Sequence, residues 1–483
     1  MGTRVSGKIY ARQLLNGFTT LGLVLLLIAH APQPTCGAET TTTTADVPLR
    51  VDRPNIIFIL TDDQRWDSLG IMGNPIIKTP NVDRLGSQGI VFLNGYVTTS
   101  ICAISRASIL TGQYESRHGI NNFSKSLTPE QVAGTYPSLL RKSGYKTGFV
   151  GKYGVGKDQP SGSFDFWECT KKTQPDYLTK DKQGREIHDT DKVTSSALKF
   201  LQKFGRQGPF CLSVSYKAPH ELDGHPPKYV VQDRFRHLYK KDHIPLPVTY
   251  APQYWSRLPE FFHTDENIAR QRWRDLYSTP QLFQENVKNY YRLITGVDDG
   301  VGKLVRKLRD SGLDKNTVII YMGDNGFSLG EHGLEGKWFG FEESIRVPLI
   351  ISYPGLPDSM RQTRPAQIAL NIDIAPTILA LAGVDKPRTM QGENLLDFLS
   401  GKLPQRKDFF YEHTFLKSPK LPQVEGVVGT QWKYMKYIEH GYEQLFDTMH
   451  DPHETVNLAL DPAYEKQLKV MRQHYQMLKK GAR

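Results

Sequence analysis

The sequence predicts an α/β fold with a large mixed, mainly parallel sheet flanked by helices, followed by a small C-terminal α+β domain. Three observations support this prediction. Apolar runs end abruptly in polar residues, helical stretches separate these runs, and residues 404–483 have the pattern of an antiparallel sheet with one helix. Buried strands of parallel sheets are apolar along their whole length, because helices cover both faces.

Five apolar runs of strand length predict the sheet. Glycine, proline or charged residues follow each run closely, which is typical of buried strands that end at a loop. The runs are Asn55–Leu60, Thr147–Val150, Phe210–Tyr216, Thr317–Met322 and Val347–Tyr353.

Helical stretches alternate with these strands, and a glycine within two residues of the end of each one indicates its C-terminus. They are Asn81–Gln88, Thr135–Ser143, Phe283–Ser311 and Ile374–Leu381. In the C-terminal region, Gly426–Ile438 and Glu443–Asp447 predict antiparallel strands, and Asp461–Lys480 predicts an amphipathic helix.

The N-terminus is typical of an export signal. Basic residues precede the apolar run Leu21–Ala29, which is too short to cross a bilayer as a helix. We therefore assign residues 1–38 to a signal peptide and the threonine-rich residues 39–50 to a linker, with a main domain at 51–403 and the small domain at 404–483. The expected location is secreted or periplasmic, without stable membrane insertion; the alternative is an uncleaved anchor.

Charge and cysteine content narrow the functional classes. The net charge of +11 suits a polyanionic substrate, although the basic residues form no long run. No helix-turn-helix, zinc-finger or RNA-binding pattern occurs, so we expect no nucleic-acid partner. Four cysteines are too few for a disulfide framework. Cys169 and Cys211 could pair, but the apolar run around Cys211 favours a buried strand residue.

Polar residues follow the predicted strands, and ligands of open α/β sheets bind at the carboxyl ends of the strands. We therefore expect the five strands to bring polar side chains to one edge of the sheet. The side chains expected there are those of Asp62, Asp63, Lys152, His220, Asp324 and Asn325.

The acidic residues at this edge predict a metal site. Crowding Asp62, Asp63 and Asp324 at buried strand ends is costly unless a cation neutralises them. Carboxylates and the Asn325 amide are hard oxygen ligands, which suit Ca²⁺ or Mg²⁺ rather than zinc. The alternative is turn and helix-cap chemistry, because Asp-Asn-Gly forms turns and Asp-Asp caps helices.

Cys102 opens a predicted helix, and Arg106 follows four residues later. A helix N-terminus beside a guanidinium favours an anion. Two alternatives remain from the residues alone: a structural cysteine, or a thiolate nucleophile of the phosphatase type, whose loop usually carries more glycines.

The stretch Ser100–Gly112 resembles the signature of the sulfatase family, a cysteine or serine followed by x-P-x-R and then Leu-Thr-Gly. In that family the cysteine is oxidised to formylglycine (3-oxoalanine), whose hydrated aldehyde is the nucleophile. Further matches follow in family order: Arg53–Ile57 with Thr61–Asp63, Thr79–Leu85, Gly151-Lys152, Ala218–His220, Gly323–Gly326, Gly336-Lys337 and Asp373–Thr377.

The resemblance implies a role for each matched residue. Asp62, Asp63, Asp324, Asn325 and the modified Cys102 would hold Ca²⁺, or alternatively Mg²⁺. Arg106 and Lys152 would stabilise the nucleophile, Lys337 would clamp the sulfate, and His220 would protonate the leaving alcohol. It also implies that residues 51–403 are the catalytic domain, that the substrate is a sulfated saccharide, and that a formylglycine-generating or anaerobic sulfatase-maturing enzyme is a partner.

Two positions depart from the family pattern. Ile104 stands where the family usually has proline or alanine, which bears on how well the maturing enzyme recognises Cys102. Gly154 stands where many members have a histidine that contacts the formylglycine. The Gly-Lys-Tyr form resembles the glucosamine-6-sulfatase branch. Water, His118 or an acid at the metal would then replace that histidine.

Two other functions fit parts of the pattern. One is a phosphate or phosphonate ester hydrolase of the same superfamily, and the other is a non-catalytic sulfoglycan-binding protein in which Cys102 is never oxidised. The identity of the sugar depends on loops such as His220–Trp273, whose aromatic residues either stack on sugars or simply pack.

Overall fold

The computed structural model describes residues 53–172, 174–181 and 183–483. The predicted signal peptide at 1–38 and linker at 39–50 lie outside these residues. Within the described part of the chain, no helix has both the length and the apolar character needed to cross a membrane.

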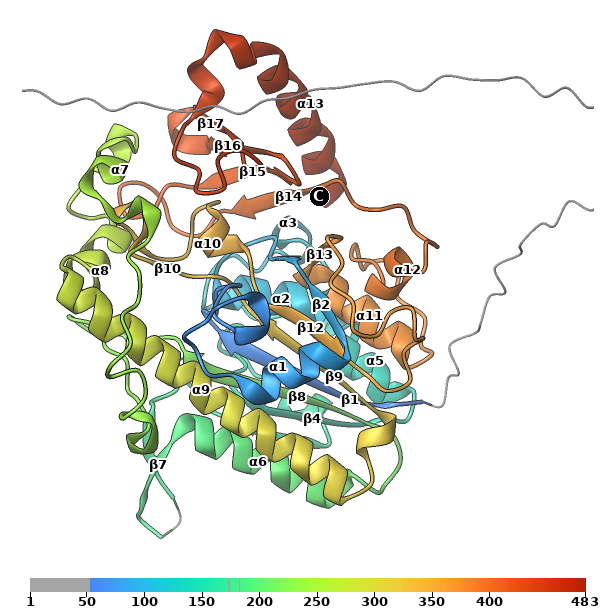
Figure 1. Ribbon diagram of the computed structural model, residues 1–483. Coiled ribbons are helices and arrows are strands. Elements are labelled where there is room, and N and C mark those ends of the chain that lie inside the picture. Colours follow the sequence, from blue (N-terminus) through green and yellow to red (C-terminus); the bar gives the residue numbers. More distant parts are fainter. Residues whose placement is uncertain (1–52, 173, 182) are drawn as a thin grey trace, which may run out of the picture. The chain divides into compact units, whose positions relative to one another are not determined.

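A seven-stranded sheet forms the centre of the described chain, in the order β2-β12-β9-β1-β8-β4-β5 (Figure 1). The five strands from β9 to β5 pair in parallel, whereas β12 is antiparallel to both of its neighbours. The strands are β1 Asn55–Asp62, β2 Ile90–Phe92, β4 Lys146–Gly151, β5 Phe166–Cys169, β8 Phe210–Pro219, β9 Thr317–Gly323 and β12 Leu349–Ser352. The predicted fold class is therefore confirmed.

Helices cover both faces of this sheet, and the alternation of side chains along β1 explains why β1 is apolar throughout. Ile57 and Ile59 lie in one core cluster with side chains of α1 Pro80–Gln88, α6 Asp189–Phe204 and α9 Pro280–Asp310. Ile56 and Phe58 lie in a second cluster on the opposite face. The helices of that face are α2 Cys102–Thr111, α5 Tyr136–Lys142 and α11 Ile374–Leu381.

The predicted strand Val347–Tyr353 exists as β12, but its direction corrects one expectation. Because β12 runs antiparallel to β9, only four of the five predicted strands bring polar residues to the same edge. A parallel return needs a crossover of a dozen or more residues, usually a helix. Between β9 and β12 the longest helix is α10 Glu342–Ile345, which is too short for a crossover, so the chain turns back.

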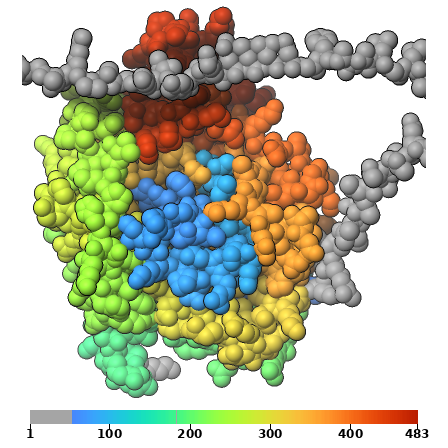
Figure 2. Space-filling view, in the orientation of Figure 1, coloured from blue at the N-terminus to red at the C-terminus, as the bar shows by residue number. Residues whose placement is uncertain are grey.

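The C-terminal region forms a four-stranded antiparallel sheet covered by one helix, and in Figures 1 and 2 it lies at one end of the described chain. Its elements are β14 Asp408–His413, β15 Val424–Gly429, β16 Trp432–Tyr437, β17 Tyr442–Asp447 and α13 Glu465–Ala482. The predicted strand Gly426–Ile438 is in fact a hairpin of β15 and β16, in which Val427 pairs with Tyr434. The sequence did not predict β14.

Shorter elements complete the fold. Three pairs of strands form small two-stranded sheets: β3 Asn94–Tyr96 with β13 Ile368–Leu370, β6 Leu178–Lys180 with β7 Glu186–His188, and β10 Ser328–Leu329 with β11 Glu335–Gly336. The remaining α-helices are α3 Glu115–His118, α4 Pro129–Ala133, α7 Pro252–Ser256, α8 Ile268–Leu276 and α12 Leu395–Leu399.

Candidate active site

All of the predicted site residues lie near one edge of the central sheet. Four of them lie at or just after the ends of parallel strands: Asp62 ends β1, and Lys152, His220 and Asp324 directly follow β4, β8 and β9. Asp63 and Asn325 follow Asp62 and Asp324, Cys102 and Arg106 belong to α2, and Lys337 follows β11. Each of these residues is at most 3% exposed, so their charges must be satisfied within the site.

Asp62 is held by basic side chains. The Lys152 ammonium group donates a hydrogen bond to Asp62 Oδ2, and Arg106 Nη2 lies 3.9 Å from the same oxygen. Burial alone would raise the pKa of Asp62, but Lys152 and the other cations nearby outweigh burial and hold it well below the usual range. Asp62 is therefore an anion in this site.

Asp63 adopts a left-handed backbone conformation with φ of 62°, which is uncommon for a residue with a side chain. Its Oδ1 accepts hydrogen bonds from Lys337 Nζ and from Asn325 Nδ2, each at 2.6 Å. His220 Nε2 lies 3.4 Å from Asp63 Oδ2. Lys337 thus neutralises this carboxylate from the side of β11.

Arg106 connects the two acidic segments. Its Nε donates to Asp324 Oδ2 at 2.7 Å, and its Nη1 donates to the Lys152 carbonyl at 2.7 Å and to Ser215 Oγ at 2.5 Å. The backbone N–H of Asp63 donates to Asp324 Oδ1 at 3.1 Å. Ser215 is a contact that the sequence did not predict, because a single polar residue inside a strand gives no signal.

The oxygen donors of the site fit a hard divalent cation. Asp62, Asp63, Cys102 and His220 each offer one atom within 4.8 Å of the others. Asp62 Oδ1 and Asn325 Oδ1 are buried and have no hydrogen-bond partner among the described residues. Oxygen atoms left unsatisfied in this way are costly unless a cation binds them, and carboxylate and amide oxygens suit Ca²⁺ or Mg²⁺.

Asp324 fits this set less simply than predicted. It lies outside the group of four residues, and its two oxygens accept hydrogen bonds from Arg106 and from the Asp63 backbone. Burial, with Asp62 close by, raises the pKa of Asp324 to about 6. A bound cation would favour the ionised carboxylate.

The protein surroundings of Cys102 favour the neutral thiol over the thiolate. Burial raises the pKa of the Cys102 thiol to about 12, although Lys152 and Lys337 act in the opposite direction. A cation bound beside Cys102 would favour the thiolate instead. The three cysteines at positions 102, 169 and 211 are free, so the possible Cys169–Cys211 pair does not form, and Cys211 is a buried residue of β8 as expected.

His220 is held in one tautomer by its surroundings. Its Nδ1 lies 2.6 Å from the Glu221 carbonyl oxygen, so Nδ1 carries the proton in the neutral ring and Nε2 is an acceptor. Burial and then the Lys337 charge lower the pKa of His220 well below its usual value. To act as an acid, the ring must first take up a second proton.

The structure explains why residue 154 is a glycine and not a histidine. Gly154 has φ of 74°, and a Cβ atom built there would lie 2.9 Å from Arg106 Cδ. His118 does not replace the missing histidine. Its Nε2 pairs with Ser108 Oγ at 3.0 Å, and its Nδ1 accepts from the Ile120 N–H at 3.0 Å.

Six aromatic residues of the segment 220–273, which also contains α7 and the start of α8, pack against other rings. The pairs are Tyr229 with Tyr290, Tyr239 with Tyr291, Trp255 with His263, Phe261 with His440, Phe262 with Phe339 and Trp273 with Tyr250. Of the two interpretations of this loop, the contacts favour packing.

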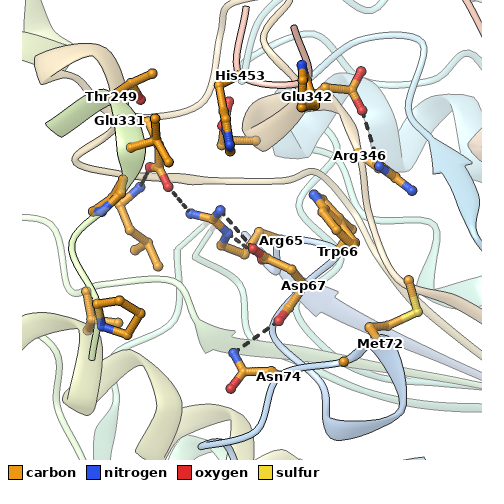
Figure 3. Close-up of a pocket in the computed structure, with 18 of the residues that line it drawn as sticks. Arg65, Trp66, Asp67, Met72, Asn74, Thr249, Glu331, Glu342, Arg346 and His453 are labelled. Atoms are coloured by element: carbon orange, nitrogen blue, oxygen red, sulfur yellow. Dashed lines mark hydrogen bonds and ion pairs between the residues drawn. The ribbon is translucent and has the colours of Figure 1, made fainter. Parts of the chain in front are cut away.

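A cavity of about 830 Å³ lies beside the continuation of β1, and none of the predicted site residues lines it. We call five charged residues of its lining the cavity network: Arg65, Asp67, Glu331, Glu342 and Arg346. In Figure 3, Arg65 lies between Glu331 and Asp67, at 2.6 Å and 2.5 Å from their carboxylates. Arg346 stacks over the Trp66 ring at 4.1 Å and lies 3.6 Å from Glu342.

Comparisons with known sequences identify the family of this chain. The Sulfatase family model matches residues 54–384, and the model for the C-terminal region of N-sulphoglucosamine sulphohydrolase matches residues 330–481. The chain is 29% identical to N-acetylglucosamine-6-O-sulfatase of Bacteroides thetaiotaomicron, over 87% of this chain and 85% of that protein. It is 31% identical to the N-acetylglucosamine-6-sulfatase of Homo sapiens, over 75% of this chain and 67% of that protein.

Solved structures share the fold. A protein solved in complex with its substrate D-glucosamine-2-N,6-O-disulfate is 26% identical, with a TM-score of 0.74 over 89% of this chain and 98% of that chain. A phosphonate monoester hydrolase of Agrobacterium radiobacter is 21% identical, with a TM-score of 0.75 over 89% of this chain and 96% of that chain, which shows the fold alone. The chain therefore belongs to the sulfatase family and is a sulfuric ester hydrolase.

Proposed function

We propose that this enzyme removes sulfate from sulfated glucosamine units of saccharides, using a formylglycine made from Cys102 beside a calcium ion. The observation that carries the proposal is the meeting of Cys102 with Asp62, Asp63 and His220 within 4.8 Å. The names of the relatives support glucosamine-6-sulfate as the substrate unit.

In this proposal, Asp62, Asp63, Asp324, Asn325 and residue 102 hold the cation. When bound, the cation polarises a sulfate oxygen, and the oxidised and hydrated residue 102 supplies the hydroxyl nucleophile. The three carboxylates are balanced by the cationic side chains of Arg106, Lys152 and Lys337. A divalent cation would make the site positively charged, as binding an anionic sulfate requires.

The basic residues have distinct tasks. Arg106 and Lys152 are fixed by Asp324, Ser215 and Asp62, so they orient residue 102 and stabilise negative charge on its oxygen without having to move. Lys337 clamps the sulfate. His220, after taking up a second proton, or Lys337 protonates the leaving alcohol. Water or an acidic residue at the metal would then take the proton of the second hydroxyl of residue 102, so that sulfate leaves as the aldehyde re-forms. This is the step that the missing histidine assists in many relatives.

The remaining parts of the proposal concern the chain outside the catalytic chemistry. We propose a catalytic domain at 51–403 and a separate small domain at 404–483. A maturing enzyme would oxidise Cys102, and the signal at 1–38 would direct the chain to a secreted or periplasmic location. The match to an extracellular sulfatase homologue of Caenorhabditis elegans, 32% identical over 77% of this chain and 54% of that protein, supports export.

The shared fold of the phosphonate monoester hydrolase keeps one alternative open to test. Relative turnover of p-nitrophenyl sulfate and p-nitrophenyl phosphate separates a sulfatase from a phosphoester hydrolase, and we expect the sulfate to be preferred. A non-catalytic sulfoglycan-binding protein would instead bind the saccharide without releasing sulfate.

The central test replaces the proposed nucleophile. Cys102→Ala should lower sulfate release from N-acetylglucosamine-6-sulfate at least about a thousandfold, because the nucleophile is lost. Cys169→Ala, a matched change of another free cysteine, should leave the rate unchanged.

Mass spectrometry provides the independent check. The peptide that contains residue 102 should be lighter than its cysteine form by about 18 Da, because oxygen replaces sulfur and two hydrogens. Full activity of Cys102→Ala, or an unmodified thiol in active enzyme, contradicts the proposal.

A further inference from the structure

Two further carboxylates lie beside the proposed acid and clamp residues. Glu221 directly follows His220, and Glu335 belongs to β11, two residues before Lys337. Both side chains are 0% exposed. No motif in the sequence singled them out, although each neighbours a matched residue.

Each of these two side chains has at least one buried oxygen without a hydrogen-bond partner. Glu221 Oε2 and both carboxylate oxygens of Glu335 have no hydrogen-bond partner in the described parts of the chain. Burial, and then the nearby Glu221, raise the pKa of Glu335 well above its usual range, and a hydrogen-bond donor or ammonium group bound to Glu335 would favour its ionised form. Leaving three buried acceptor atoms unsatisfied is costly, so such an arrangement indicates atoms that a ligand satisfies.

A continuous series of contacts joins Glu221 to both the metal site and the surface. His220 lies 3.4 Å from Asp63 Oδ2 and 3.7 Å from Glu221 Oε2. Arg272 contacts Glu221 Oε1 at 2.5 Å and Asp223 Oδ1 at 2.9 Å. The Arg272 side chain is 21% exposed and that of Asp223 is 46% exposed. Glu221 is thus the link between the sulfate site and solvent.

A second metal ion is not what this group favours. His220, Glu221 and Asp223 offer atoms within 4.8 Å of one another. However, the Arg272 guanidinium already bridges Glu221 and Asp223 and supplies their positive charge. Glu335, the carboxylate with two unsatisfied oxygens, lies outside that group. The unsatisfied oxygens of Glu221 and Glu335 therefore need hydrogen-bond donors.

The sugar on the alcohol side of the scissile ester can supply these hydrogen-bond donors. The leaving oxygen must lie next to His220 or Lys337, and the sugar that carries it extends from there. Sugar hydroxyl and ammonium groups donate hydrogen bonds to carboxylates, whereas a sulfate or carboxylate substituent would be repelled.

We propose that Glu221 and Glu335 accept hydrogen bonds from hydroxyl or ammonium groups of the sugar that bears the scissile sulfate. The pair is then a specificity-determining subsite, and this inference rests on the proposed function. It selects sugars with neutral or cationic groups at that position and leaves the cleavage of the sulfate ester itself to the other residues.

Binding and turnover test the subsite separately. In Cys102→Ala protein, Glu335→Gln should weaken binding of N-acetylglucosamine-6-sulfate, measured by calorimetry, at least about tenfold. In the active enzyme, Glu335→Gln should lower kcat/KM for the same sugar by a similar factor. Hydrolysis of p-nitrophenyl sulfate, which has no sugar hydroxyls, should stay within about twofold.

The stability of the variant distinguishes a binding role from a structural one. Because Glu335→Gln removes a buried group that lacks a partner, its Tm should equal or exceed that of the parent protein. Glu425→Gln is the matched control: Glu425 is buried in β15 and pairs with Tyr475 and Lys479, so this change should lower Tm and leave both substrates unaffected.

Three results would overturn the inference. These are equal losses on the sugar and the aryl ester, unchanged sugar binding in Glu335→Gln, and a lower Tm for Glu335→Gln. Failure of the proposed function gives a different result, because wild-type enzyme would then release no sulfate from the sugar while binding could still be measured in the Cys102→Ala background.

Discussion

Two charged regions of the molecule, one partly buried and one fully buried, make an instructive contrast. In the cavity network the charges find partners, since Arg65 pairs with Asp67 and Glu331, and Glu342 pairs with Arg346. At the strand ends, Asp62 Oδ1, Asn325 Oδ1 and Arg106 Nη2 are buried without hydrogen-bond partners in the described chain, and so are both oxygens of Glu335.

The paired charges of the cavity network serve stability, whereas the unsatisfied atoms at the strand ends serve function. Paired charges need nothing further, even around a cavity of about 830 Å³. Unsatisfied buried atoms cost free energy of folding, and a site keeps them where a ligand meets them. At the sulfatase site the unsatisfied atoms of Asp62, Asn325 and Glu335 lie beside the predicted catalytic residues, whereas the cavity does not include these residues.

The largest expected effect comes from removing an unsatisfied metal ligand. Asp62→Asn should lower sulfate release at least about a thousandfold, since the cation loses a charged ligand. Addition of Ca²⁺ to chelator-treated wild-type protein should raise Tm, and this rise should disappear in Asp62→Asn. Asp67→Asn, in the cavity network, should keep both activity and the Ca²⁺ response. A calcium response that survives in Asp62→Asn would break the contrast.

Removal of a paired carboxylate of the cavity network should lower stability and leave activity unchanged. Glu331→Ala leaves the buried Arg65 with one partner fewer, and we expect the free energy of unfolding in urea to fall by about 3 kcal/mol. Hydrolysis of p-nitrophenyl sulfate at low temperature should be unchanged. Asp67→Ala removes the more exposed partner of Arg65 and should cost less than about 1 kcal/mol. Loss of activity without loss of stability in Glu331→Ala would contradict this assignment.

Glu343 is the exception in the lining of the cavity, because its Oε2 has no hydrogen-bond partner among the residues described. Burial, and then the Glu331 carboxylate, raise the pKa of Glu343 to about 8. Between about pH 4.5 and 8 the folded chain holds a proton that the unfolded chain releases. The contribution of Glu343 to stability is therefore full below about pH 4.5 and is lost as pH rises through 8.

Replacement of Glu343 by glutamine should make the free energy of unfolding less dependent on pH. Between pH 6 and 8, the unfolding free energy of Glu343→Gln should fall less than that of wild type, by up to about 1.4 kcal/mol per pH unit. Denaturant titrations at a series of pH values measure the difference, with Asp67→Asn as a control of unchanged slope. Parallel curves for wild type and Glu343→Gln would show that Glu343 is ionised like its neighbours.

The sequence predicted those features that follow from local rules. Continuous apolar runs located β1, β8 and β9, and the rule for strand ends then brought Asp62, His220 and Asp324 together. The direction of β12 depends on the length of its connection to β9. The existence of β14 depends on its pairing with β15. Neither the direction of β12 nor the existence of β14 can be predicted from the local sequence pattern.

Contacts across the fold were also beyond local pattern. Ser215, Glu221 and Glu335 stand out only once the side chains around them are placed, because a single polar residue in an apolar run has no period or motif. Likewise, His118 was a candidate for chemistry until its two ring nitrogens were found to be bonded to Ser108 and Ile120.

The left-handed glycine at position 154 has an evolutionary consequence. Any side chain there would be strained and would meet Arg106, which itself holds Asp324. A histidine therefore cannot be introduced there by one mutation without disturbing a residue on which the reaction depends. Its introduction would require a second, compensating change at or near Arg106, so the two positions are expected to change only together.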